Sequence, residues 1–257
     1  MSESSRVLFL HGGPGLNAEL ERRRFGTSLP VHWWDQPHVS AEESAPYDHL
    51  VNAALEELHR LSRANGAPID LLANSFGAHL ALELIEQAPA KVGHVSIVGG
   101  ILDVRTAFVR LGRCVAEKNQ HQDLAAASLR ADQSDDSTSL WGLIECLFSV
   151  ANLLDFYWSP TATEQRDAMK QLAAEGALLH VPTYQTVLTD FLARNSPRES
   201  SEWHGAANVW IGRYDPYASP EDIEAWQKVF PRASVQFVDA GHFLHLELPR
   251  SVWLPVA

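Results

Sequence analysis

One stretch, residues 69–84, limits what this chain can fold into. It begins as a short apolar run and continues as a helix-like segment, and Ser75 lies between the two. The small residues Ala73 and Gly77 stand two positions on either side of the serine. A strand that turns tightly into a helix disfavours bulky side chains at those positions and exposes the serine hydroxyl at its tip. The pattern predicts a nucleophile elbow, with the amide of Phe76 at a helix N-terminus where it stabilises negative charge.

The segment alone allows a second interpretation, in which Ser75 merely caps a core helix. The rest of the chain must decide between them. Its apolar pattern alternates between strands and helices. We expect strands at 7–10, 29–34, 69–73, 92–98, 207–211 and 234–238, and helices at 16–25, 46–64, directly after Ser75, and at 219–229. Such alternation produces a parallel sheet covered on both faces, so we expect an α/β fold with six strands, mostly or all parallel.

Residues 103–202 interrupt this alternation with helical periodicity and little strand pattern. The sequence thus predicts an α/β core, residues 1–102 and 203–257, and a helical cap, residues 103–202. The apolar run 140–158 in the cap has the length of a membrane span. Because charged residues such as Glu145 interrupt it, we expect instead a cap helix that packs over an apolar cleft.

Composition excludes some classes of partner. The 257 residues contain 20 Lys and Arg against 32 Asp and Glu, a net charge of −12. An acidic surface argues against binding to nucleic acid or to anionic membranes. The first residues lack the charged-then-apolar pattern of a secretory leader, so we expect a cytoplasmic protein. Cys114 and Cys146 lack metal-ligand spacing and are expected to be two buried thiols, and the sequence indicates no oligomeric state.

Two residues join Ser75 as candidates for catalysis. Asp215 follows the strand at 207–211, and His242 follows the last strand. The carboxyl ends of parallel strands meet at one edge of the sheet, where ligands bind. We therefore predict a triad in which His242 deprotonates Ser75 and later protonates the leaving group. Asp215 would orient the imidazole and stabilise its charge.

A glycine-rich turn, His11–Gly15, ends the first strand. Glycine at position 12 lets the backbone approach a substrate, and the amide of Gly13 is expected to pair with that of Phe76. Two such donors hold the oxyanion of a tetrahedral intermediate. This chemistry proceeds on protein groups, so we expect neither a cofactor nor a metal.

Other roles for these segments stay open. Asp103, just after the fourth strand, is an alternative triad acid, whereas Asp239 shares the strand of His242 and is expected to point elsewhere. His242, His245 and Glu247 have the composition of a metal site but lack further ligands nearby.

A dinucleotide site is a further alternative. Residues 13–18 fit the form Gly-x-Gly-x-x-Ala after a strand, and Asp35 ends the next strand. This interpretation leaves the serine, aspartate and histidine of the triad unexplained, and Pro14 removes an amide from the turn that would hold phosphate.

Taken together, these motifs resemble those of the α/β-hydrolase fold, and most closely its proline iminopeptidase-like branch. The resemblance covers about residues 1–102 and 203–257 and rests on His11–Gly15, Trp34–Gln36, Ala73–Gly77 with Leu80–Leu82, Gly212–Asp215 and Gly241–His242. It implies hydrolase activity with the triad and the oxyanion donors named above. The antiparallel hairpin usual at the edge of this fold is expected to be missing.

Three departures limit what the resemblance implies. Ala73 stands where the family usually has glycine, and Pro37-His38 replace its Arg-Gly. Aminopeptidases of this family hold the substrate's free amine with cap carboxylates, including a Trp-Glu pair that has no match in residues 103–202. Glu145 is the cap carboxylate we nominate instead. The resemblance therefore favours a hydrolase more strongly than an aminopeptidase.

The aromatic cap favours a substrate with a hydrophobic acyl or leaving group. We expect Gly12, Trp141, Glu145, Phe148 and Tyr157 to contact it. The prediction is a serine hydrolase that cleaves a small-molecule or short-peptide ester or amide, an N-terminal peptide bond among the candidates. The same triad also suits a lyase, an acyltransferase or a cyclase. A non-catalytic small-molecule receptor is the last alternative, and the intact triad counts against it.

Overall fold

The structure is a computed structural model that describes residues 5–194 and 200–254. Residues 1–4, on which the expectation about a leader partly rests, lie outside this range. The described residues form one six-stranded sheet in the order β2-β1-β3-β4-β5-β6, and every neighbouring pair is parallel. The strands are β1 (Val7–Leu10), β2 (Val31–Trp33), β3 (Ile69–Asn74), β4 (Val92–Val98), β5 (Ala206–Gly212) and β6 (Ser234–Val238). The prediction of six parallel strands is confirmed.

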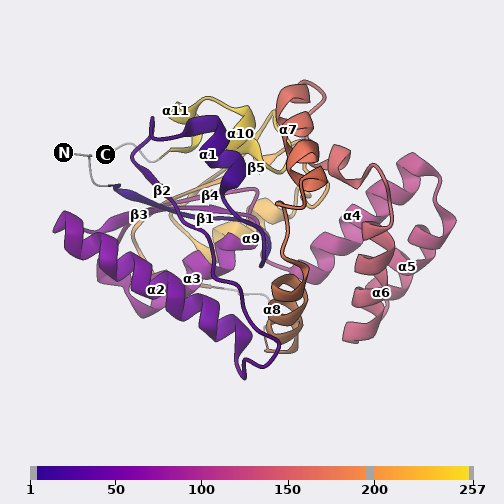
Figure 1. Cartoon of the computed structure of the whole chain (residues 1–257), viewed down its shortest axis with the longest axis horizontal. Coiled ribbons are helices and arrows are strands. Elements are labelled where there is room, and N and C mark those ends of the chain that lie inside the picture. The colour runs from indigo at the N-terminus through magenta and orange to yellow at the C-terminus, as the bar shows by residue number, and fades with distance from the viewer. Residues whose placement is uncertain (1–4, 195–199, 255–257) are drawn as a thin grey trace.

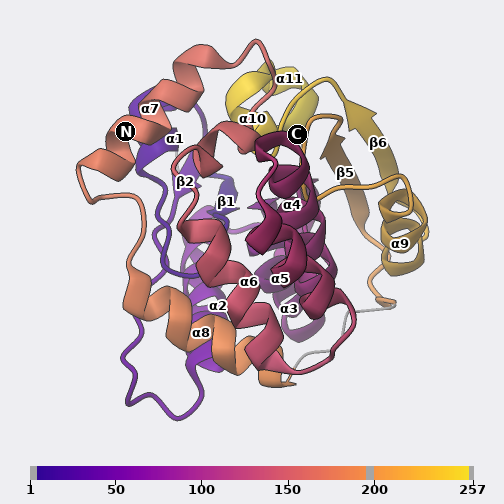
Figure 2. The ribbon, with the colours of Figure 1, turned by 90° about the vertical axis from the view of Figure 1, so that its right-hand side faces the viewer.

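Helices cover the sheet on both faces and at one end (Figure 1). In chain order they are α1 (Glu19–Phe25), α2 (Pro46–Asn65), α3 (Gly77–Gln87), η1 (Pro89–Lys91), α4 (Val104–Asn119), α5 (Gln122–Asp132), α6 (Ser137–Phe148), η2 (Leu153–Tyr157), α7 (Thr163–Ala174), α8 (Val181–Arg194), α9 (Asp222–Val229), α10 (Leu244–Glu247) and α11 (Arg250–Trp253). Helices α2 and α3 lie on one face, and α1, α10 and α11 lie on the other. Helices α4 to α8 stand in front of the sheet when the molecule is turned by 90° (Figure 2).

Successive side chains of a central strand point to opposite faces of the sheet. In β1, Leu8 and Leu10 join the core that includes residues of α2 and α3, whereas Val7 and Phe9 join the core that includes residues of α10 and α11. All four are buried. A strand covered on both faces has no polar side, which explains why these strands are continuous apolar runs in the sequence.

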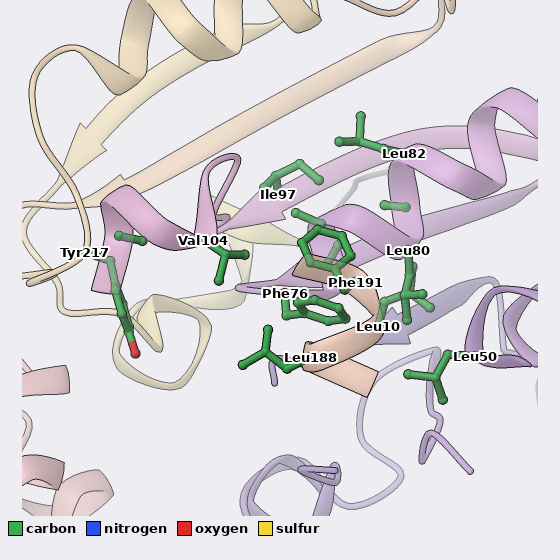
Figure 3. Close-up of a cluster of buried hydrophobic side chains, with 14 of the residues drawn as sticks. Leu10, Leu50, Phe76, Leu80, Leu82, Ile97, Val104, Leu188, Phe191 and Tyr217 are labelled. Atoms are coloured by element: carbon green, nitrogen blue, oxygen red, sulfur yellow. The ribbon is translucent and has the colours of Figure 1, made fainter. Parts of the chain in front are cut away.

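Helix α8 connects the predicted cap to the core. It lies within residues 103–202, yet its Phe191 ring stands 5.1 Å from the ring of Phe76 and 4.6 Å from that of His79, centroid to centroid. Figure 3 shows Phe191 among the side chains of this core cluster, close to Phe76 and Leu80. The division into core and cap thus stays a prediction, and α8 packs with the core.

Some predicted elements differ from the structure. The run 140–158 is not one helix: α6 ends at Phe148, the non-helical residues 149–152 follow, and the short η2 comes next. Among the described residues, no helix has the length and apolar character needed to cross a membrane. The thiols of Cys114 and Cys146 are free but only half-buried, so the expectation of two buried thiols was wrong. Both lie on helices that have a solvent-facing side.

The order of the strands places two loops side by side. The chain passes from β1 outward to β2 and then returns to the other side of β1 to form β3. The loops that follow β1 and β3 therefore leave the sheet where its winding direction changes. In open parallel sheets this switch point is where ligands bind.

Candidate active site

Ser75 occupies a strained turn at the end of β3. Its backbone is left-handed, with φ of 53°, a conformation that few non-glycine residues adopt. Gly77 is required just beyond it, because a Cβ atom there would lie 2.0 Å from the carbonyl oxygen of Leu10 in β1. The close packing of α3 against β1 thus explains the small residue of the sequence motif. The local geometry is that of a nucleophile elbow.

The glycine-rich turn after β1 lies against the serine. A Cβ atom on Gly12 would stand 2.9 Å from the Cβ atom of Ser75 and 3.0 Å from the Oδ1 atom of Asn74, so only glycine fits. Gly13 follows with a φ of 48°, and Gly13 and Phe76 line the same cavity. The structure therefore brings together the two residues from which the sequence predicted oxyanion donors.

His11 and Gln36 hold this turn in place. The Nε2 atom of His11 accepts the backbone N–H of Gln36 at 3.0 Å, and the Gln36 side chain donates to the His11 carbonyl oxygen at 3.0 Å. The other ring nitrogen, Nδ1, lies 2.9 Å from the carbonyl oxygen of Gly12 and donates to it. This set of bonds requires the neutral ring, and burial lowers the pKa of His11. The sequence motifs indicate neither of these roles.

Asp215 and His242 form a buried hydrogen bond. The Nδ1 atom of His242 lies 2.8 Å from the Oδ2 atom of Asp215, and the two side chains are 3 % and 2 % exposed. The other carboxylate oxygen of Asp215 accepts the backbone N–H of Tyr217 at 2.9 Å. The backbone N–H of His242 donates to the carbonyl oxygen of Tyr157 at 2.8 Å. The aspartate therefore fixes the tautomer and orientation of the imidazole.

The side chain of Asn74 connects the elbow to the histidine loop. Its Nδ2 atom donates to the carbonyl oxygen of Val98 at 2.8 Å and to that of His242 at 3.3 Å. Asn74 is the variable residue before the serine in the sequence motif, and the motif alone does not indicate this role.

Asp103 and Asp239, the other acids near the predicted triad, have partners other than His242. Asp103 caps α4, because its Oδ1 atom accepts the backbone N–H of Thr106 at 3.0 Å and its Oδ2 atom accepts the Thr106 hydroxyl at 2.8 Å. Asp239 is exposed and pairs with Arg213 at 2.9 Å, so it points away from His242 as expected.

The metal site considered around His245 is also not assembled. His245 is buried and its Nε2 atom lies 2.8 Å from the Oε1 atom of Glu21. Glu247 accepts the backbone N–H groups of Gly241 and Ser159. Within the described part of the chain, no cluster of three or more His, Cys, Asp or Glu side chains could hold a metal ion.

The residues that fit the dinucleotide-binding motif, 13–18 and Asp35, contact other parts of the protein. Asp35 accepts the backbone N–H of Ala18 at 2.8 Å and pairs with Arg22 at 2.9 Å. A Cβ atom on Gly15 would lie 2.6 Å from the carbonyl oxygen of His180, because the start of α8 packs against the turn. The turn thus contacts the protein where a pyrophosphate would have to approach.

A cavity of about 150 Å³ opens beside Ser75. Its wall contains Ser75, His242, Gly12, Gly13 and Phe76, as the sequence predicted for one site. The other wall residues are Pro14, Leu16, Ile101, Val104, Phe108, Phe148, Leu154, Tyr157, Met169, Leu178, Leu179, Tyr184, Leu188, Tyr217 and Phe243. No Asp, Glu, Lys or Arg is among these described wall residues. The site is a small apolar pocket with a few polar groups.

Two of the predicted contact residues lie outside this wall. Helix α6 turns Leu143 and Leu147 inward, so Glu145 points to solvent. Trp141 is not among the described wall residues, and its ring packs edge-on against Tyr184 at 6.2 Å between centroids. Trp141 and Glu145 are thus not among the described wall residues, whereas Phe148 and Tyr157 are. Tyr184, Tyr217 and the other apolar wall residues were missed, because only the packing of the helices brings them together.

A second, larger cavity of about 680 Å³ lies behind Asp215, between the start of α4 and α9. Its wall includes Asp103, Arg110 and Asp222, and the last two form an ion pair at 2.9 Å. Neither Ser75 nor His242 is part of its wall. Size alone would favour this cavity, but Ser75 and His242 line the smaller one.

Comparison with known proteins assigns this fold to a family. The model of the Alpha/beta hydrolase family matches residues 7–253, and the chain belongs to this family. Ethanol acetyltransferase 1 of Kluyveromyces marxianus is 23 % identical over 270 residues, which cover 95 % of this chain and 70 % of that protein.

Solved structures of related fold include hydrolases. A proline iminopeptidase-related protein from Thermus thermophilus superposes with a TM-score of 0.68 at 24 % identity, covering 98 % of this chain and 87 % of that one. An N-acyl homoserine lactone degrading enzyme superposes with a TM-score of 0.62 at 17 % identity, covering 96 % of this chain and 89 % of that one. The resemblance deduced from the sequence motifs is thereby confirmed at the level of the fold.

Proposed function

We propose that this protein is a serine hydrolase that cleaves small, neutral, apolar esters through an acyl-enzyme intermediate. Ser75 is the nucleophile, His242 the general base and then the general acid, and Asp215 the group that orients His242. The amides of Gly13 and Phe76 hold the oxyanion. The observation that carries the proposal is the buried His242–Asp215 hydrogen bond of 2.8 Å beside a serine in an elbow.

The elbow supports the role of Ser75 through its electrostatics. Helix α3 begins at Gly77, directly after Phe76, so its positive end faces the position of the developing oxyanion. The strained backbone of Ser75 persists only because the packing around Gly77 and Gly12 enforces it. Strain retained at such a point is typical of a functional site.

The cavity wall supports the choice of substrate class. An aminopeptidase needs a carboxylate near the scissile bond to hold the free amine, and none of the described wall residues provides one. Glu145, the carboxylate nominated from the sequence, is exposed on α6. A volume of about 150 Å³ matches that of an apolar cavity able to hold a benzene-sized group. A short acyl or aryl group fits this site, and a peptide with a charged terminus does not.

A second candidate is transfer of the acyl group to an alcohol. The similarity to an ethanol acetyltransferase favours it, since both reactions share the acyl-enzyme and differ only in the acceptor. An apolar wall around Ser75 would favour ethanol over water as the acceptor.

The first experiment is labelling with a fluorophosphonate probe, together with turnover of p-nitrophenyl pentanoate and proline p-nitroanilide. We expect labelling and ester turnover in the native protein, loss of both in Ser75→Ala, and little anilide turnover. Absence of labelling and turnover in the folded native protein would overturn the proposal. Formation of ethyl pentanoate when ethanol is added would identify the acyltransferase.

Substitution of the acid provides a matched comparison. Asp215→Asn should lower kcat about 10⁴-fold, because the amide stabilises the wrong imidazole tautomer. Asp103→Asn is the control, since asparagine still caps α4 and Asp103 does not touch His242. Equal losses in the two variants would contradict the assignment of Asp215.

A further inference from the structure

Tyr184 carries a buried hydroxyl without a hydrogen-bond partner among the described residues. The residue lies on α8, lines the cavity beside Ser75 and is only 7 % exposed. A polar group buried without a partner costs about 1–3 kcal/mol, so such groups are rare in folded proteins. A ligand that supplies the missing partner would explain why a tyrosine is placed in this apolar wall.

Two more tyrosine hydroxyls lie in the same wall. The hydroxyl oxygens of Tyr157 and Tyr217 are 3.2 Å apart, and their rings stack with centroids 5.7 Å apart. Their hydrogen bond uses one of the two hydroxyl protons. In Figure 3 the Tyr217 side chain lies to one side of the other labelled side chains. Tyr157, Tyr184 and Tyr217, here called the tyrosine cluster, come from η2, from α8 and from the loop after β5.

All three phenols are hydrogen-bond donors under ordinary conditions. Burial raises the pKa of Tyr157 to about 12, and it raises the pKa values of Tyr184 and Tyr217 well above the usual value of 10.0. Nearby phenols add to the effect, because Tyr157 acts on Tyr184, which in turn acts on Tyr217. Each hydroxyl therefore keeps its proton across the pH range of an enzyme assay.

We propose that the tyrosine cluster, through Tyr184 above all, recognises an uncharged oxygen acceptor on the substrate. The acceptor is an ether, a ketone or a second ester carbonyl within the apolar group that the cavity encloses. The inference rests on the proposed function in one respect, that this cavity is the place of the substrate. Tyr184 determines specificity and takes no part in bond making or breaking.

The energetics favour an oxygen-bearing ligand over a plain hydrocarbon. The hydroxyl of Tyr184 is already removed from water in the free protein, so the ligand's oxygen gains a hydrogen bond at no added desolvation of that group. A hydrocarbon of the same shape leaves the hydroxyl unpaired. Sites built to hydrogen-bond a substrate in this way discriminate strongly against analogues that lack the polar group.

The primary test is a binding measurement that needs no turnover. Cyclohexanone and methylenecyclohexane have the same shape and differ by one oxygen, and their affinities are compared by NMR titration. We expect the native protein to favour cyclohexanone, and Tyr184→Phe to reduce the ratio of the two affinities by about 3- to 10-fold. Tyr214→Phe is the matched control, because Tyr214 is 48 % exposed and lies outside the described wall.

A kinetic measurement places the acceptor along the substrate. The p-nitrophenyl esters of pentanoic, ethoxyacetic and 3-methoxypropanoic acid have equal chain length and differ in whether and where an oxygen stands. Comparing each ester between native protein and Tyr184→Phe cancels the intrinsic reactivity of the esters. If the cavity encloses the acyl group, we expect kcat/KM of one ether ester, relative to pentanoate, to fall about 3- to 10-fold in the variant.

The outcomes separate this proposal from the proposed function. An affinity ratio that is unchanged in Tyr184→Phe, or failure of the native protein to bind cyclohexanone, overturns the role of the tyrosine cluster even if Ser75 is an active nucleophile. A changed ratio in a protein that shows no labelling of Ser75 overturns only the proposed hydrolase. If Tyr184 had a purely structural role, Tyr184→Phe would lower the affinities for both ligands by the same factor and leave their ratio unchanged. Tyr217→Phe is the second variant and is expected to lower the ratio too.

Discussion

At the scale of single residues, the proposed active site contains histidines whose hydrogen-bond partners fix the tautomer and orientation of the ring. His242 presents Nδ1 to Asp215, and Tyr217 donates its backbone N–H to the other oxygen of that carboxylate. His11 is held in the neutral state by an N–H that it must accept from Gln36. The position of the turn at Gly12 and Gly13 therefore depends on the protonation state of His11.

The protonation of His11 has a measurable effect on stability. Burial lowers its pKa below the ordinary value of 6.5, so the unfolded chain takes up the proton first as the pH falls. The free energy of unfolding should therefore decrease with falling pH below about 6.5. His32 and His94, whose pKa values burial also lowers, contribute with the same sign.

The prediction for His11 is tested by urea unfolding at a series of pH values. In His11→Gln, whose amide oxygen still accepts the N–H of Gln36, the loss of stability between pH 6.5 and about 5 should be shallower than in the native protein. Parallel curves for the two proteins would show that His11 is not the group that titrates.

At the scale of elements, the junction of β3 and α3 has the least tolerance for change. The start of α3 packs directly on the end of β1, with the carbonyl oxygen of Leu10 where a side chain at position 77 would begin. The same contact holds Ser75 in its left-handed conformation. Packing between elements, and not local preference, keeps the serine at the tip of the turn.

We expect Gly77→Ala to lower the free energy of unfolding by about 1–3 kcal/mol or more and to reduce ester turnover, since the methyl group would meet backbone atoms at 2.0 Å. Gly142→Ala in α6 is the matched control. Apart from its chain neighbours and the backbone of its own helix, no described atom lies within 4 Å of its Cβ position, so alanine should stabilise that helix by about 0.5–1 kcal/mol. Thermal unfolding of both variants measures these opposite effects on stability. An unchanged stability in Gly77→Ala would contradict the prediction.

At the scale of the whole molecule, the proposed substrate site lies where helices from residues 103–202 meet the carboxyl ends of the strands (Figure 2). Phe148 lines the cavity and is also 53 % exposed, so it stands at the mouth. Its ring packs against Tyr184 at 5.6 Å between centroids. The size of the bound group is therefore limited where α6 meets α8.

Removal of this ring should lengthen the preferred acyl chain. In Phe148→Ala we expect the ratio of kcat/KM for p-nitrophenyl octanoate over pentanoate to rise about 10-fold, since the shortened side chain opens the mouth of the cavity. Leu129→Ala serves as control, because Leu129 is equally exposed on α5 and lies outside the described wall. An unchanged ratio in Phe148→Ala would place the mouth elsewhere.

The sequence by itself determined the parallel sheet and the turns at its carboxyl edge. Continuous apolar runs are dictated by burial on two faces, and the small residues around Ser75 are dictated by a contact that leaves no room for a Cβ atom. Such constraints involve residues that are close together in the chain or that recur with the fixed period of a strand. The spacing of residues in the sequence is therefore enough to deduce them. His242 and Asp215 were found in the same way, as residues that follow strands.

Only the tertiary structure determined which residues form the wall of the cavity. Glu145 and Phe148 lie within one turn of α6, yet one faces solvent and the other lines the site. The apolar stripe of α6 fixes which side of that helix faces inward, but whether Phe148 at its end reaches the cavity depends on where α6 packs against α8. For the same reason Tyr157, Tyr184 and Tyr217, far apart in the chain, became one cluster only through the fold.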